Sequence, residues 1–402
     1  MLSIHRKKRM LVVAFITIAL VASTIGPASV APSASSRIFD GESHRSDQGN
    51  LKESDYKCVQ RSAKAKPPDR LSPKFRARDK YREPAYKPLG LKALCSEGQV
   101  AVPTSTRHFK PETPKGNPLL GYISDRRAFE RNPGAVVRRS LRPFKQVYWK
   151  GRGLDEKHHA NTLMPAPACD GVSYFGSCYY YASAAFRRTA DGGGMTMSVE
   201  RPNYVSGESG GHTLNEIAIQ GGAGDGNIVE LGWNVSSDQY GDSNPHLFVF
   251  HWIDWNPTCY DGCGWQQYSG TYFPGMDLSQ IVGRQVYVGY VFFQGNWWAW
   301  FDNQWLGYFP GSEWGGKYTR SELIQWFGEV ASSNGVPPRT DMGNGRFPPD
   351  AAAATMFTLC DVDAPAWVCW YRDMQVLGST VPAYYDIART GFGATRYGGP
   401  GE

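Results

Sequence analysis

The feature that most constrains the fold is a series of short apolar runs with a period of two. In the first clear run, Met195, Met197 and Val199 alternate with polar residues. Further runs lie at 216–220, 228–235, 247–253, 286–293 and 297–301, with Gly, Pro, Asn and Asp clusters between them. Several short strands with frequent turn signals indicate an antiparallel sandwich or barrel. The sequence therefore predicts an all-β fold, and a helical turn is expected only near 319–323.

Composition places the main core in the C-terminal part of the chain. Twelve of the 13 tryptophans follow Ala166, whereas residues 37 to about 90 are polar and rich in proline. A segment of the second kind buries little apolar surface and is expected to be extended or partly disordered. Short apolar pieces between 91 and 148 indicate a small folded pro-domain, followed by a basic linker at 138–152.

The first 34 residues are typical of a secretory signal peptide. Residues 5–9 are basic, residues 10–25 are apolar, and small residues follow at 28–34. A membrane anchor is the alternative, but an apolar run of about 16 residues is shorter than the roughly 20 needed to span a bilayer. We therefore predict a secreted protein that has no membrane attachment once the signal is cleaved.

The chain has eight cysteines, and an even number suits disulfide bonds in an exported protein. They form four neighbouring couples along the chain: Cys58 and Cys95, Cys169 and Cys178, Cys259 and Cys263, and Cys360 and Cys369. Local bridges within these couples are the simplest pairing. A zinc site would need a second close cysteine pair or nearby histidines. We therefore expect no metal and no cofactor.

The net charge of +6 hides two halves of opposite sign. Residues 37–165 hold 28 Lys and Arg against 14 Asp and Glu, whereas residues 166–402 hold 11 against 23. The basic half could indicate nucleic-acid binding, but it is poor in aromatics and has no binding motif. We expect it to bind the acidic half of its own chain, with an attraction that weakens as carboxylates take up protons. This pattern is typical of a pro-segment released in acid, so we predict no nucleic-acid partner.

Two nucleophile hypotheses receive little support. Gly207-Glu208-Ser209-Gly210-Gly211 resembles the nucleophile turn of trypsin-type proteases. That chemistry needs an upstream histidine base held by a carboxylate, and neither His158 nor His159 lies at the end of an apolar strand. A plain turn between strands explains the same residues. A cysteine nucleophile is not expected, because each cysteine has a partner.

Two glutamates are better candidates for catalysis. Glu230 interrupts the apolar run at 228–235, and alternation puts it on one face with Gly232 and Asn234, opposite the core face. The glycine beside it would leave backbone open to a ligand. Glu329 follows a glycine inside the apolar run at 325–330. Exposed strand glutamates are the ordinary alternative for both positions.

The region from about Gly194 to Cys360 resembles the neprosin family of secreted glutamic peptidases. The similar blocks follow the family's order: Glu230-Leu231-Gly232-Trp233-Asn234-Val235, Tyr240-Gly241-Asp242, Leu247-Phe248 before Trp252, Cys259-Tyr260-Asp261-Gly262-Cys263, Asn296-Trp297-Trp298, Leu306-Gly307-Tyr308-Phe309-Pro310, Gly328-Glu329-Val330 and 340–348. In the N-terminal half, Tyr56-Lys57-Cys58-Val59 and Leu94-Cys95-Ser96-Glu97-Gly98 resemble parts of the family's activation peptide.

This resemblance implies an antiparallel β-sandwich with a cleft on one concave face, and Glu230 and Glu329 in the places of the two catalytic glutamates. It also implies cleavage after proline and an activation peptide that covers the cleft until acid removes it. We therefore expect a signal peptide (1–34), an activation peptide or pro-domain with its linker (35–150) and a catalytic β-sandwich (151–402). The N-terminal segment would act as an intramolecular inhibitor, and a peptide or protein would be the substrate.

Three residues depart from the family's pattern. Phe327 replaces the first of two glycines on the predicted face of Glu329, where it could narrow the cleft or change substrate preference. Leu231 replaces an alanine on the core face, which is a packing change. Glu216 replaces a glutamine and adds a third carboxylate near the site.

Two carboxyls held close together share one proton at acid pH. The ionised one takes a proton from water, and the neutral one donates to the scissile carbonyl and then to the leaving nitrogen. The pair titrates as a unit, so the sequence does not assign the two roles. Trp252, Trp298, Tyr308 and Phe327 are the candidate residues for the substrate pocket, although the tryptophans and the tyrosine would also suit the core.

Two other function classes remain open on the sequence. β-Sandwiches with paired carboxylates and exposed tryptophans also bind or hydrolyse carbohydrates. A secreted wall or adhesion protein that kept the fold without the activity is the third class. Reducing-sugar release at neutral pH would favour the first alternative, and inertness at every pH would favour the second.

Overall fold

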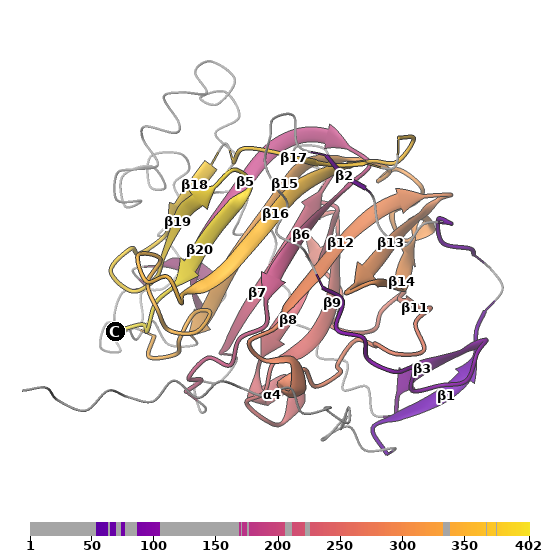
Figure 1. Cartoon of the computed structure of the whole chain (residues 1–402), viewed down its shortest axis with the longest axis horizontal. Helices are drawn as coiled ribbons and strands as arrows, with labels where there is room; N and C mark the ends of the chain where they lie inside the picture. Colours follow the sequence, from indigo (N-terminus) through magenta and orange to yellow (C-terminus); the bar gives the residue numbers. More distant parts are fainter. Residues whose placement is uncertain are drawn as a thin grey trace, which may run out of the picture. The chain divides into compact units, whose positions relative to one another are not determined.

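The computed structural model describes residues 54–62, 65–69, 74–76, 87–104, 169, 171–174, 177–205, 211–221, 226–332, 338–366, 368–374 and 376–402. These residues form two large β-sheets and one two-stranded sheet (Figure 1). The predicted all-β, antiparallel fold is confirmed. The predicted signal peptide, the basic linker and the turn around Ser209 lie outside the described residues.

The first large sheet has eight strands in the order β10–β9–β8–β7–β15–β5–β18, and β4 also pairs with β5. Its strands are β4 (Val172–Tyr174), β5 (Ser177–Ala190), β7 (His212–Gln220), β8 (Ile228–Val235), β9 (His246–Ile253), β10 (Asn256–Pro257), β15 (Ser321–Ser332) and β18 (Val376–Ser379). Every pairing in it is antiparallel. The short helix α4 (Ser237–Tyr240) connects β8 to β9.

The second large sheet has ten strands in the order β11–β14–β13–β12–β6–β16–β17–β2, with β20 beside β16 and β19 beside β20. Its strands are β2 (Lys74–Arg76), β6 (Gly192–Ser198), β11 (Gln266–Gln267), β12 (Gln285–Phe293), β13 (Asn296–Phe301), β14 (Gln304–Pro310), β16 (Ala354–Asp363), β17 (Val368–Tyr371), β19 (Asp386–Gly391) and β20 (Ala394–Gly398). Two single turns of 3₁₀ helix, η3 (Ser279–Ile281) and η4 (Gly311–Trp314), lie in its connections. The one parallel pairing in this sheet joins β2 to β17.

Each of the six apolar runs found in the sequence forms a strand. The helical turn expected at 319–323 is wrong, because Ser321 already begins β15. Strand pairing on both sides explains the difference: β15 bonds to β5 on one side and to β7 on the other, and these ladders override a weak local helical pattern.

The main core lies between the two large sheets. Leu231 and Trp233 of β8 are fully buried in it, as the alternation predicted. The indole nitrogen of Trp233 donates to the carbonyl of Ser198 at 2.9 Å, and that of Trp326 donates to the carbonyl of Gly194 at 3.2 Å. Both hydrogen bonds run from the eight-stranded to the ten-stranded sheet. Each tryptophan therefore joins the two sheets by a hydrogen bond as well as by its buried apolar surface.

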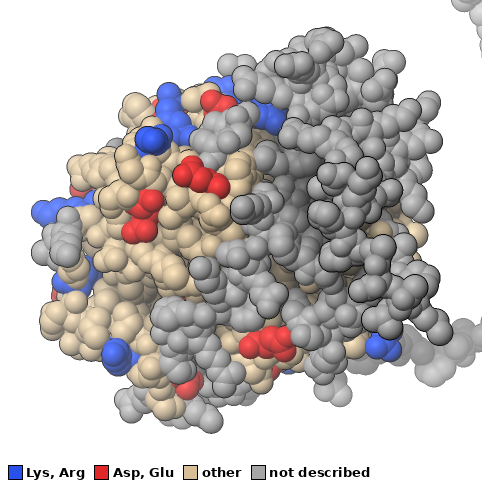
Figure 2. Space-filling view, turned by 180° about the vertical axis from the view of Figure 1, so that it is seen from behind, with Lys and Arg blue, Asp and Glu red and all other residues tan. Residues whose placement is uncertain are grey.

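Each large sheet also buries apolar residues on its outer face. On the eight-stranded sheet these are Tyr181, Leu214, Ala218, Ile228, Phe248, Phe250 and Phe327. On the ten-stranded sheet they are Tyr287, Val291, Trp298, Trp300, Trp305, Tyr308, Cys360, Val362, Cys369 and Tyr371. Seen from behind, the described surface is mostly uncharged and its Asp and Glu side chains lie in separate small groups (Figure 2).

The described part of the N-terminal region packs on the ten-stranded sheet. β1 (Tyr56–Gln60) and β3 (Gln99–Pro103) form the small antiparallel sheet near β11, drawn in indigo in Figure 1. The amide of Leu94 donates to the carbonyl of Gly270 at 2.8 Å, and the amide of Leu89 donates to Asp302 at 3.1 Å. The guanidinium of Arg61 lies 4.1 Å from the ring centre of Tyr268. These contacts join the described residues 54–62 and 87–104 to the sandwich, away from the face that carries Glu230.

The four cysteine couples form four disulfides, Cys58–Cys95, Cys169–Cys178, Cys259–Cys263 and Cys360–Cys369. The local pairing is therefore confirmed. Among the described residues, no helix has the length and apolar character that crossing a membrane requires.

Gly232 sits where two strand backbones approach closely. It is opposite Glu216 in the β7–β8 ladder, and a Cβ atom there would overlap the carbonyl oxygen of Asn215. The space beside Glu230 is therefore filled by the backbone of β7, which corrects the expectation that this glycine leaves backbone open to a ligand.

We expect Gly232→Ala to destabilise the fold by about 3 kcal/mol, because overpacking against backbone cannot be relieved by a side-chain rotation. Urea unfolding of the two proteins would measure the difference. Gly391→Ala is the matched control, because a Cβ there meets only Ala394 at an ordinary 3.8 Å. Equal losses in the two variants would contradict the assignment of a special role to Gly232.

Candidate active site

Three glutamates lie on the outer face of the eight-stranded sheet, one on each of three adjacent strands. Glu230 belongs to β8, Glu216 to β7 and Glu329 to β15. In the two ladders, Glu216 is opposite Gly232 on one side and Phe327 on the other. Glu230 and Glu329 are thus its diagonal neighbours, each at about 7–8 Å between Cα atoms. The two diagonals continue in one direction, so Glu216 is the midpoint of a row.

Local sequence explains why Glu329 points away from the core. Gly328 before it faces the core, where an added Cβ would lie 2.6 Å from the ring of Tyr397 and 2.9 Å from the sulfur of Met342. A glycine is therefore needed at this position, and alternation then turns Glu329 to the outer face. Glu230 and Glu329 lie on the same face, which the two-glutamate hypothesis requires.

Glu230 is buried and has a neutral hydrogen-bond donor. Glu230 is only 7% exposed, and the indole nitrogen of Trp252 donates a hydrogen bond to its Oε1 at 2.8 Å. Burial raises the pKa of Glu230 to about 8, against the opposite effect of the Trp252 hydrogen bond, and the charge of Glu329 raises it further. Glu230 is therefore an acid that keeps its proton at low pH.

Glu329 lies in a different electrostatic setting. Its Oε1 is 2.6 Å from Nε2 of His212, the first residue of β7. This is the one ion pair of Glu329 within the described ranges, and its cation is a histidine instead of a permanently charged arginine. Protonated His212 would stabilise the Glu329 carboxylate. The two outer glutamates therefore differ: one is suited to carry a proton and the other to carry a charge.

Glu216 is the most buried of the three, at 3% exposure. Burial raises its pKa well above the ordinary value, and the charges of Glu230 and Glu329 raise it further. Its location confirms that a third carboxyl lies beside the other two.

Aromatic side chains surround the row of glutamates. Phe327 is fully buried beside Glu216 in the ladder, and its ring meets that of Tyr181 edge-on at 5.8 Å. Phe250 stacks on Tyr260 at 4.6 Å. Burial raises the pKa of Tyr260 well above its usual value, and the three glutamates add to the shift. Tyr260 belongs to the loop closed by Cys259–Cys263, so this loop forms part of the site.

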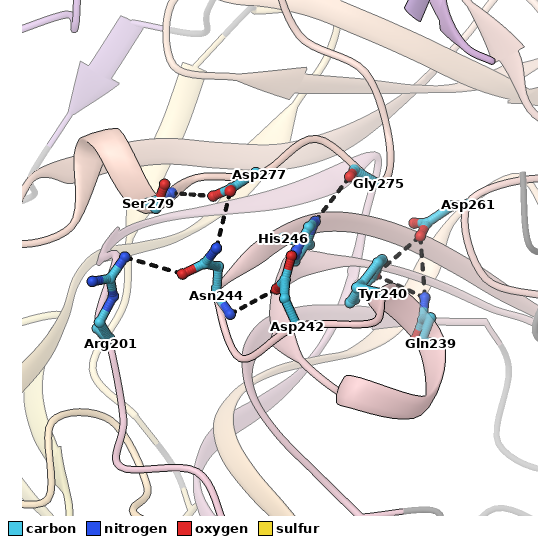
Figure 3. Close-up of polar contacts among 10 residues, drawn as sticks. All are labelled: Arg201, Gln239, Tyr240, Asp242, Asn244, His246, Asp261, Gly275, Asp277 and Ser279. Atoms are coloured by element: carbon cyan, nitrogen blue, oxygen red, sulfur yellow. Dashed lines mark hydrogen bonds and ion pairs between the residues drawn. The ribbon is translucent and has the colours of Figure 1, made fainter. Parts of the chain in front are cut away.

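A polar network holds that loop in place (Figure 3). Oδ2 of Asp261 accepts hydrogen bonds from Tyr240 at 3.0 Å and Gln239 at 3.1 Å, and its Oδ1 accepts from the amide of Val249 at 3.2 Å. Burial raises the pKa of Asp261 to about 7, against these hydrogen bonds. The ring of Tyr240 stacks on His246 at 4.1 Å. Asp261 therefore ties the loop with Tyr260 to α4 and β9.

His246 extends the same network (Figure 3). Its Nε2 lies 3.0 Å from Asp242 and its Nδ1 lies 2.9 Å from the carbonyl of Gly275. Burial alone would lower the pKa of His246, but the hydrogen bonds with Asp242 and Gly275 outweigh it and raise the pKa.

The candidate pocket residues divide between two places. Trp252 and Phe327 lie with the glutamates, but Trp298 and Tyr308 do not. They pack together at 4.5 Å on the outer face of the ten-stranded sheet. Alternation along β13 and β14 points both side chains to this outer face. The core between the sheets therefore separates them from the glutamates, and their assignment to the substrate pocket is withdrawn.

The buried polar atoms on the glutamate face that have no hydrogen-bond partner among the described residues include Nε2 of Gln325, Oγ of Ser183, Oε1 of Gln220 and Oδ1 of Asn234. Of these, Nε2 of Gln325 is an amide donor. Gln325 and Glu230 are at the same level across the sheet, because Gln325 is opposite Ala218 and Ala218 is opposite Glu230 in the two ladders. An unpaired buried donor costs about 1–3 kcal/mol. A ligand acceptor placed here would remove that cost.

Residues 209–400 match the family model described as Neprosin. These residues form a Neprosin-family domain. The match includes Glu216, Glu230 and Glu329, and it supports a peptidase.

The chain, including this Neprosin domain, also has weak similarity to solved structures. One is Scytalido-glutamic peptidase with a peptide-based transition state analog, at a TM-score of 0.35 and 12% identity over 55% of this chain and 97% of that one. Another is SCP-B, a member of the Eqolisin family of peptidases, at 0.31 and 10% over 55% and 97%. CG-16, a homodimeric agglutinin from chicken liver, matches at 0.23 and 10% over 37% and 93%. At these TM-scores the similarities do not enter the assignment of function.

Sequence reasoning missed three residues of the candidate site. His212 shares the parity of Glu216 on β7, so extending the alternation four residues back would have placed it on the same face. Gln325 has the parity of Glu329 and could have been found in the same way. For Tyr260 the sequence holds no such signal, because only the folding of its loop brings it to the glutamates.

Proposed function

We propose that this chain is the precursor of a secreted, acid-acting glutamic endopeptidase that cleaves proline-containing peptides. The observation that carries the proposal is the pair Glu230 and Glu329, which lie on one face of a Neprosin-family domain in unlike electrostatic settings. Glycoside binding is less well supported, because Trp298 and Trp300 are fully buried instead of exposed.

In the proposed mechanism Glu329 is the general base. It accepts a proton from a water molecule, and His212, whose Nε2 lies 2.6 Å from its Oε1, orients the carboxylate for that step. The resulting hydroxide attacks the carbonyl carbon of the scissile peptide bond.

Glu230 is the general acid in this mechanism. Its raised pKa keeps the carboxyl protonated through the acid range, so its proton is ready for the leaving nitrogen when the tetrahedral oxyanion collapses. The proton that Glu329 took from water then returns to Glu230, which restores both groups for the next cycle. Trp252 donates to Oε1 of Glu230, which fixes the orientation of the carboxyl group. The two outer glutamates thereby take the complementary roles that peptide hydrolysis needs.

Gln325 is the proposed donor to the tetrahedral oxyanion. Its Nε2 is buried and unpaired among the described residues. In the ladders, Gln325 and Glu230 lie on the two sides of Ala218. A donor that is already desolvated and fixed stabilises developing charge without reorganisation.

Gln325→Leu is expected to lower kcat on the order of 10²-fold, with a smaller change in KM, because the donor acts mainly in the transition state. Steady-state kinetics on a proline-containing peptide would show the split. Gln285→Leu, at the exposed first position of β12, is the matched control. A fall in kcat/KM that comes entirely from KM would assign Gln325 to substrate binding instead.

The N-terminal half is proposed to be an inhibitory pro-segment. Its net positive charge suits the acidic half, and this charge carries the proposal. The described residues between 54 and 104 contact the ten-stranded sheet and not the glutamate face. Sequencing the N-terminus of the protein after exposure to acid would test processing, and a new N-terminus between residues 141 and 166 is expected. A chain that stays intact while it becomes active would overturn the pro-segment.

The activity itself is tested by acidifying the purified precursor and offering proline-containing peptides. Mass spectrometry of the products would give the cleaved bond, with the same peptides carrying alanine for proline as the comparison. Cleavage in acid at proline is the expected result. Inertness at every pH, with an intact fold, would reject the peptidase.

A further inference from the structure

Glu216 is the residue of the glutamate row to which the mechanism above gives no task. It lies midway between the proposed acid and the proposed base, one diagonal step from each. At this midpoint a negative charge would repel both neighbours at once. The place of Glu216 therefore makes its charge state decisive for the whole row.

The groups around Glu216 offer little to balance a charge on it. Its neighbours in the row are two more carboxyls, and His212, on its own strand, already contacts Glu329. Tyr260 from the disulfide loop and Tyr290 from β12 interact with it electrostatically, and burial followed by the nearby glutamates raises the pKa of both phenols. Both are uncharged at low pH. Among the described residues, no Arg or Lys forms an ion pair with Glu216.

We propose that Glu216 is a positioning residue of this site, a third carboxyl that stays uncharged while Glu230 and Glu329 hold a single negative charge between them. As a neutral acid it can both donate and accept a hydrogen bond, which neither an aliphatic side chain nor a carboxylate can do. It would thus hold its two neighbours along the row without adding charge. The direction of its pKa shift agrees with this role.

The protonation of Glu216 can be tested without any activity. Infrared spectra of the full chain at neutral pH would be recorded for the wild type, for Glu216→Gln and for Glu322→Gln, which changes an exposed glutamate of β15. We expect the absorption of protonated carboxyl groups to fall in Glu216→Gln and to stay constant in Glu322→Gln. An unchanged band in Glu216→Gln would overturn the proposal.

The positioning role rests on the proposed function and needs kinetics of the acid-activated protein. Glu216→Ala is expected to lower kcat/KM on the order of 10²-fold, because the row loses the hydrogen-bonding group at its midpoint. Glu216→Gln, which has the shape of the neutral acid, is expected to recover most of that loss without moving the acidic limb of the pH profile. A limb that moves to lower pH in Glu216→Gln would show that Glu216 was charged, and failure to recover activity would reject the positioning role.

Thermal unfolding of both variants separates misfolding from a local effect. If the wild type itself shows no peptidase activity, the proposed function fails, while the infrared comparison still decides whether Glu216 is protonated.

Discussion

Glutamine in place of Glu329 is expected to lower kcat/KM for a proline-containing peptide by about 10³–10⁴-fold, near the upper end of what one acid–base group contributes. The amide has nearly the same shape but cannot accept a proton from water. Glu230→Gln is expected to cause a loss of similar size for a different reason, because an amide has no acidic proton for the leaving nitrogen. Kinetics at the acid optimum of the activated protein would measure both losses.

The double variant separates a cooperating pair from two independent groups. If Glu230 and Glu329 act in one step, the loss in the double variant should be far smaller than the product of the two single losses. Glu322→Gln on the same strand as Glu329 is the control for changing a glutamate outside the site. Wild-type rates in either single variant would remove that glutamate from the mechanism.

The second large effect is on stability: the folded protein should lose stability steeply as the pH rises from about 6.5 to 8. Glu230 has a folded pKa of about 8 against an ordinary 4.5, so between these values the folded state holds a proton that the unfolded chain has released. Each such group lowers the free energy of unfolding by about 1.4 kcal/mol per pH unit in its window. Glu216 adds a second group of the same sign above its ordinary pKa of 4.5, because its pKa is also raised by burial.

Other buried groups shape the same curve. The pKa of Asp261 is raised to about 7, so its contribution falls with rising pH up to that value. The pKa of His246 is also raised, so the stability it adds is complete below its ordinary 6.5 and is lost above it. His251 opposes them: burial lowers its pKa to about 3, which costs stability as the pH falls from 6.5 towards 3. The opposition therefore ends above pH 6.5, where the loss should be steepest.

Urea unfolding at a series of pH values would give this curve. Glu230→Gln should reduce its slope above pH 6.5 by about 1.4 kcal/mol per pH unit, since one proton no longer takes part. Glutamine can still accept the hydrogen bond of Trp252, so the contact itself is retained. A wild-type stability that is constant or rising from pH 6.5 to 8 would contradict the raised pKa values of the buried carboxyls.

The strands and their faces were predictable because the signal is local. Alternation placed Leu231 and Trp233 in the core and Glu230 on the outer face, and the structure agrees. The same rule put Phe327 on the face of Glu329. Within a short strand bounded by clear turns, alternation fixes which side chains share a face. The faces of each strand could therefore be predicted separately.

Which residues of different strands lie together in the site was not predictable in the same way. Trp298 and Tyr308 have the aromatic character of pocket residues, but they lie on the other sheet. Alternation separates the two faces of a strand. It does not say which face packs in the core between the two sheets and which lies on the outer face of the strand's own sheet. Both faces of these strands are apolar, so composition did not separate them.

The sequence alone therefore determined the all-β class, the four local disulfides and the shared face of Glu230 with its neighbours on β8, because all of these depend on residues close in the chain. Only the tertiary structure decided that Glu216 stands between Glu230 and Glu329, that His212 contacts Glu329, and that Tyr260 reaches the row. Those relations depend on strand order and register, which arise from contacts between residues far apart in the chain.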